Sequence, residues 1–119
     1  EPGNMSKPGI VTAIPKRRYR LGEFSLTVLG DIESSDGRDY RYIMAVIQGD
    51  NPEPGIYLTA EYSGGAGSNR HDMRLVMRDG EDIIGSSEDW HDVDVFTEEA
   101  IGIVSQILKL TDEEPYRMM

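Results

Sequence analysis

The sequence contains no cysteine. A disulfide framework, a thiolate metal site and a cysteine nucleophile are therefore excluded. Long apolar runs are also missing, because the longest stretch, Ile43 to Ile47, is far shorter than the roughly 20 residues that span a bilayer. Ile10 to Ile14 is too short and too mixed for the apolar part of a signal peptide. We therefore expect a cytoplasmic protein that does not bind membranes.

Basic residues are scarce in the second half of the chain, and the formal net charge is -10 over 119 residues. From Asp79 to Glu114, twelve acidic side chains accompany a single base, Lys109, whereas the charges from Lys7 to Arg20 are all basic. An excess of acid repels nucleic acid and anionic membranes, and it keeps a small domain in solution. Nucleic acid is therefore an unfavoured partner.

Apolar and polar residues alternate with period two over most of the chain, which is typical of strands. The alternation predicts strands near residues 19–32, 38–48, 56–62, 70–78 and 81–85, and a weaker one at 93–96. Thr97 to Leu110 instead places its apolar residues on one half of a helical wheel, with Thr97 as the expected N-cap. We predict an α+β fold: an antiparallel five- to six-stranded meander sheet with one C-terminal amphipathic helix packed on one face.

The length suits a single domain, since a chain of this size hides roughly two thirds of its unfolded surface. We place this α+β domain at residues 19–119, after an extended N-terminal arm at residues 5–18. Residues 1–4 precede a Met5–Ser6 pair and are interpreted as a cloning remnant outside the fold.

Residues 88–94 hold the densest group of potential ligands, four carboxylates and the imidazole of His91. Such a group can hold a hard divalent cation or bring an acid and a base together. The spacing matches no known ion loop, because the turn glycine and the distant glutamate of an EF-hand are missing. We predict a solvated acidic loop with Trp90 tucked beneath it, and no metal or cofactor. A small-ligand or metal-dependent enzyme using residues 88–94 is the first alternative.

Catalytic motifs are absent elsewhere. His71 shares a strand face with Met73 and Leu75, so we expect it at the margin of the core. No Gly-x-Ser-x-Gly elbow is present. The glycine-rich residues 63–69 join two strands and lack Gly-Lys-Ser/Thr, which favours a hairpin loop over a phosphate loop. No catalytic residue is predicted, and the sequence favours a protein that is not an enzyme.

Lys16 to Arg20 mixes bases with an aromatic residue, a combination found in grooves that bind single strands of nucleic acid. Single-stranded nucleic-acid binding through residues 16–20 is the second alternative. Because the rest of the chain is so acidic, we expect these bases to pair with the acidic end of this chain, within or between subunits.

Arginine and tyrosine also occur on strand faces that the helix does not cover. Both are enriched where protein surfaces meet. One helix covers only one face of the sheet, so Ile43 and Ile47 opposite it need a partner or further cover. We predict a non-enzymatic protein-interaction module that acts as a homodimer, with a further, unknown protein partner. The candidate interaction surface comprises Arg17, Arg18, Tyr19, Arg41, Ile43, Tyr57 and Arg74.

Overall fold

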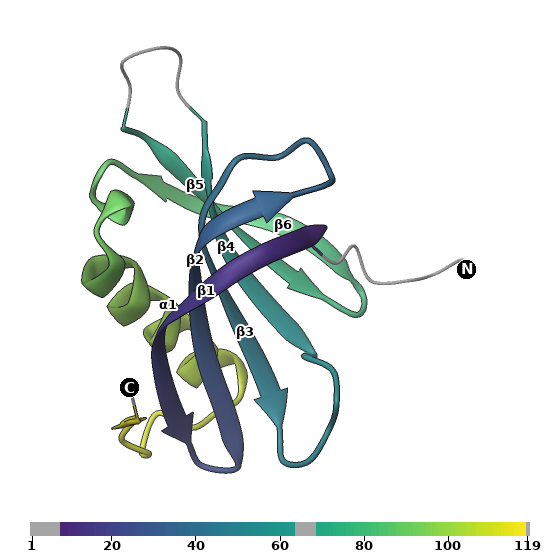
Figure 1. Ribbon diagram of the computed structural model, residues 1–119. Coiled ribbons are helices and arrows are strands. Elements are labelled where there is room, and N and C mark those ends of the chain that lie inside the picture. The colour runs from purple at the N-terminus through teal and green to yellow at the C-terminus, as the bar shows by residue number, and fades with distance from the viewer. Residues whose placement is uncertain (1–7, 64–68, 119) are drawn as a thin grey trace.

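The computed structural model describes residues 8–63 and 69–118, which form a seven-stranded antiparallel sheet and one long helix (Figure 1). The elements are β1 (Ile10–Leu21), β2 (Phe24–Ser34), β3 (Tyr40–Gln48), β4 (Ile56–Tyr62), β5 (His71–Met77), β6 (Gly80–Ser87), the 3-10 helix η1 (Asp89–His91), α1 (Val93–Ile107) and β7 (Tyr116–Arg117). The spatial order is β6-β5-β4-β3-β2-β1-β7. The predicted α+β class and antiparallel sheet are confirmed, and the sheet has more strands than the five to six expected.

The first hairpin accounts for one of the additional strands. Residues 19–32 were expected to form one strand, but the chain turns at Gly22, whose φ of 60° is easily adopted without a side chain. Leu21 then pairs with Phe24, and β1 runs antiparallel to β2. The N-terminal arm expected at residues 5–18 is, from Ile10 onward, part of β1.

Helix α1 begins four residues earlier than the predicted N-cap, Thr97. The true N-cap is Asp92, whose Oδ1 accepts hydrogen bonds from the backbone N–H groups of Asp94 (2.9 Å) and Val95 (3.2 Å). Thr97 lies inside the helix and donates its hydroxyl to the carbonyl oxygen of Val93 at 2.6 Å. The strand considered at residues 93–96 is therefore wrong, because this segment is the first turn of the helix.

The main core lies between α1 and one face of the sheet. Phe96, Ala100 and Val104 of the helix are fully buried, and the ring of Phe96 stacks on Tyr42 with centroids 5.6 Å apart. The strands contribute residues that alternate along their length, which is the period-two pattern of a half-covered sheet. They include Leu26, Val28, Met44, Val46, Leu58, Ala60 and Met73.

A second, smaller apolar cluster lies on the opposite face of the sheet. Tyr40, Ile43, Ala45, Tyr57 and Val76 are buried there, with Ile10 and Ile32 packed against them. The outer halves of β1 and β2 cross this face diagonally (Figure 1). Bulges between β1 and β2 and the positive φ of Asp31 (48°) accompany the bend. The face that was expected to need a partner or further cover is thus covered in part by the chain's own first hairpin.

None of the helices in the described residues is both long and apolar enough to cross a membrane. The interpretation of residues 1–4 as a remnant and the glycine-rich centre of the predicted 63–69 loop, residues 64–68, lie outside the described residues.

Candidate interaction surface

Three residues of the predicted surface lie on the sheet face opposite α1. Ile43 is fully buried and Tyr57 is 8% exposed, both within the second cluster. The Arg74 side chain is also largely buried and lies between two carboxylates. Ile43 and Tyr57 therefore pack beside residues of the first hairpin, and Arg74 is enclosed by its ion pairs.

Arg74 is the centre of an ion-pair network on that face. Its Nε donates to Oε2 of Glu61 at 2.9 Å, and its Nη1 donates to Oε1 of Glu81 at 3.0 Å. Glu61, itself only 8% exposed, also accepts the hydroxyl of Thr59 at 2.8 Å, and Arg38 donates to Glu81 at 3.4 Å. Buried charges must be paired in this way to be tolerated, so the network fixes how β4, β5 and β6 lie side by side.

A neighbouring carboxylate, Asp36, ties the first hairpin to β3. Its side chain accepts the Tyr40 hydroxyl at 2.6 Å and the backbone N–H groups of Gly9 and Arg38. Burial tends to raise the pKa of Asp36, but these hydrogen bonds outweigh it and lower the pKa. Burial and the same carboxylate raise the pKa of Tyr40, which therefore stays a hydroxyl donor.

The basic residues of β1 are distributed over different environments. Arg17 donates to Oδ1 of Asp94 in the first turn of α1 at 3.1 Å, a pairing within the chain between its basic segment and its acidic end. Tyr19 packs against the main core, and Arg18 is exposed at the strand edge. Arg17 and Tyr19 thus lie on the helix side of the sheet, whereas Arg18 pairs with Thr27 and lies on the Ile43 side, two strands away from Ile43.

Arg41 of β3, the last predicted surface residue, contacts η1. Its Nε and Nη2 atoms donate to the carbonyl oxygen of His91 at 3.2 and 3.1 Å, and the Tyr42 hydroxyl donates to the same oxygen at 3.0 Å. Its guanidinium also lies 5.2 Å from the centre of the Tyr42 ring. Arg41 therefore anchors η1 to the sheet.

The acidic segment 88–94 forms η1 and the start of α1. Trp90 is buried beneath it, 8% exposed. Asp92 caps α1, Asp94 pairs with Arg17, and the Nδ1 atom of His91 lies 3.0 Å from the carbonyl oxygen of Glu88. Among the described residues, no group of three or more His, Asp or Glu side chains is placed to hold a metal ion.

His71 lies deeper than expected, with no exposed surface. Its ring packs against Tyr62 with centroids 4.3 Å apart, and neither ring nitrogen has a hydrogen-bond partner of ordinary geometry. The pKa of His71 is lowered because burial penalises the charged form, although the nearby Asn69 backbone favours that form. Burial thus favours the neutral form of this histidine.

Two adjacent exposed apolar residues at one edge of the sheet were missed by sequence reasoning. Ile83 and Ile84 of β6 are 50% and 42% exposed, and β6 is the outermost strand at its edge of the sheet. A bulge interrupts the β5–β6 register next to them. Two adjacent apolar residues break the period-two pattern of a strand. This break was the signal in the sequence that β6 carries an apolar residue on each of its two sides.

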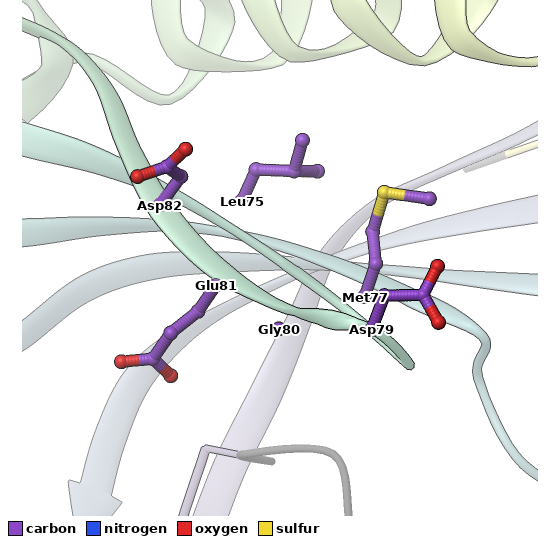
Figure 2. A pocket seen from close by; sticks show the side chains of 6 residues that line it. All are labelled: Leu75, Met77, Asp79, Gly80, Glu81 and Asp82. Carbon is purple, nitrogen blue, oxygen red and sulfur yellow. The ribbon is translucent and has the colours of Figure 1, made fainter.

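Two hollows follow each other along the side of β6 that faces α1. The first, about 290 Å³, lies over Leu75 and Met77 beside the β5–β6 turn. Figure 2 shows Leu75 and Asp82 on the side nearer the helix, whereas Glu81 points the opposite way. The second hollow, about 350 Å³, lies between Ile84 of the strand and Ile103 of the helix, with Trp90 in its wall. We call these two hollows and the outer edge of β6 the β6 groove.

In comparisons with known proteins, no protein-family model, no curated protein and no solved structure matched this chain.

Proposed function

We propose that this protein is a protein-interaction module that binds a partner along the edge strand β6. The observation that carries the proposal is the exposure of Ile83 and Ile84 on a strand whose outer edge no other strand of the described residues covers. Such an edge offers a row of backbone donors and acceptors to which an extended segment can add. The β6 groove supplies apolar side chains beside that row.

The alternative functions have less support, because their residues have structural roles. In the acidic segment, Asp92 caps α1 and Asp94 pairs with Arg17. The same ion pair occupies one base of the segment at residues 16–20, and β7 pairs with β1 at Tyr19 and Arg20. An enzyme site or a nucleic-acid groove would have to form from the remaining residues of each segment.

The homodimer stays a prediction, and so does the cytoplasmic location. The argument for a dimer was the apolar face around Ile43, and that residue is fully buried under the chain's own first hairpin. Light scattering at micromolar protein concentration tests the dimer directly, and a monomer there contradicts it.

Hydrogen exchange of the β6 amides tests the proposed function. Three short strand-forming peptides, one basic, one acidic and one neutral, are added separately to the protein. Protection of β6 amides by at least one peptide is expected, because a strand added to the edge engages its outward N–H groups. The variant Ile84→Ser should weaken that binding. Val11→Ser should leave it unchanged, because Val11 is an exposed apolar residue of β1 and not of β6. Failure of all three peptides to protect β6 would overturn the proposal.

A further inference from the structure

We propose that the partner of the β6 edge is a cationic extended segment in which Lys or Arg alternates with apolar residues. This inference rests on the proposed function. The segment would add to β6 as an eighth strand, with its apolar side chains in the β6 groove. Three observations support this partner: the charge of the groove lining, the position of its apolar patches, and the way the opposite edge of the sheet is covered.

The lining of the β6 groove is charged with one sign. Four of its residues are acids that no ion pair of the described residues holds, and no Lys, Arg or His lines it: Asp79, Asp82, Asp89 and Glu99. A fifth acidic residue of the lining, Glu81, points its side chain the opposite way and pairs there with Arg74 and Arg38. The other four lie at the rim of a surface that must lose water when a partner binds, and cationic side chains offset that cost.

The apolar patches of the groove suit an extended chain. Alternate residues of a strand point to the same side and are spaced by about 7 Å. The two hollows lie along one side of β6, beside Gly80 to Asp82 and beside Ile84 to Ser87. A partner strand alongside β6 would therefore place alternate side chains over Leu75 and then over Ile84, with its backbone paired to the strand edge.

A second copy of the acidic β6 fits this edge poorly. Pairing of β6 with β6 brings together two grooves whose linings both carry only negative charge, in a chain with a net charge of -10. Like charges brought together across an interface are destabilising. The basic strand β1 of a second copy has the right sign, but β7 pairs with its outer edge at Tyr19 and Arg20, which is the end of the strand where its bases lie.

The opposite edge shows the same type of pairing within the chain. β7 follows three acidic residues, Asp112 to Glu114, and it adds to β1 beside the exposed Arg18 and Arg20. The ladder continues where the N–H of Met118 donates to the carbonyl oxygen of Arg18 at 2.7 Å. The paired residues of β7, Tyr116 and Arg117, carry no acidic side chain. This edge therefore shows that a short extended segment can add to the sheet through its backbone, which is the kind of pairing that we propose for β6.

The test uses the full chain and three peptides: an alternating Lys/Val peptide, the corresponding Glu/Val peptide, and the Lys/Val peptide with its central residue changed to Pro. Trp90 is the chain's single tryptophan and lies in the wall of the second hollow, so its fluorescence reports binding. Exchange of the β6 amides is followed in parallel. We expect the unbroken basic peptide to bind and to protect β6. The Pro-interrupted peptide should bind much less, because proline lacks the N–H that a strand ladder requires.

Charge variants identify the groove. Asp82→Asn combined with Glu99→Gln should weaken binding of the basic peptide about tenfold at about 0.15 M salt, because it removes two carboxylates from the rim. The matched control, Asp112→Asn with Glu113→Gln, makes the same charge change on exposed residues that precede β7 at the far edge, and should have less than about a twofold effect.

Each contrary result has a separate meaning. Binding of the acidic peptide alone would overturn the cationic partner and leave the proposed function standing. Equal binding of the broken and unbroken basic peptides would overturn strand addition, since charge alone would then explain the affinity. Failure of every peptide to protect β6 would overturn both proposals.

Discussion

Replacing Phe96 by Ala tests whether α1 begins at Val93 and whether its first turn is part of the core. The Phe96 side chain has no exposed surface and stacks on Tyr42 with an interplanar angle of 28°. Truncation of such a ring removes the transfer free energy of its carbons and leaves a cavity, which costs about 3–5 kcal/mol. Unfolding entropy near 2 cal/mol/K per residue makes 1 kcal/mol worth about 4 °C in this chain, so the Tm should fall by about 12–20 °C.

Urea unfolding followed by circular dichroism and by Trp90 fluorescence measures this loss. Val95→Ala is the matched control, because Val95 is the adjacent residue of the same helix and is 43% exposed. Its free energy of unfolding should change by less than about 0.5 kcal/mol. A loss below about 1 kcal/mol for Phe96→Ala, or equal losses for the two variants, would refute the position of the helix and the packing of its first turn.

Three further perturbations test other contacts. Asp92→Ala should lower the free energy of unfolding by about 1 kcal/mol, because it removes the acceptor for two helix N–H groups. Asp89→Ala removes the same charge ahead of the helix and should lower it less. Equal losses for the two variants would contradict the assigned cap. The free energy of unfolding should fall as the pH drops below about 6.5, because His71 is protonated there in the unfolded chain while burial disfavours its charged form in the folded protein. In urea titrations, His71→Leu should flatten this pH dependence and His91→Gln should not. Arg74→Met should lower the free energy of unfolding by about 3 kcal/mol, because it leaves Glu61 without its ion-pair partner in the interior. Adding Glu61→Leu should restore part of that loss. No recovery in the double variant would show that the ion pair is not the cause.

The sequence predicted the elements whose patterns are strong and local. The apolar half of the helical wheel correctly identified α1, and period-two alternation identified β3, β4 and β5. The N-cap was misplaced because Asp92 and Thr97 are both good capping residues, and the burial of Phe96, which favours the earlier start, cannot be read from the local sequence. The turn at Gly22 was read as a bend within one strand, since a glycine is compatible with either.

The candidate site was harder to predict, because it depends on which faces remain uncovered. Ile43 and Tyr57 have the composition of an interface, but the bent first hairpin covers them, and that bend involves long-range pairing between β1 and β2. Ile83 and Ile84 resemble core residues in the sequence. Their exposure follows from the position of β6 at the end of the strand order, which no local pattern specifies.

The short strand β7 has a consequence for how copies of this protein can assemble. The acidic β6 lies at one end of the sheet, and at the other end the basic strand β1 is followed only by the two-residue β7. Without β7, the β1 edge of one copy complements the β6 edge of the next. A contact between two different edges does not close on itself, so it propagates into an open filament rather than a dimer. We therefore expect β7 to oppose such filaments, so the scattering mass of a protein shortened to residues 1–110 should rise more steeply with concentration than that of the full chain.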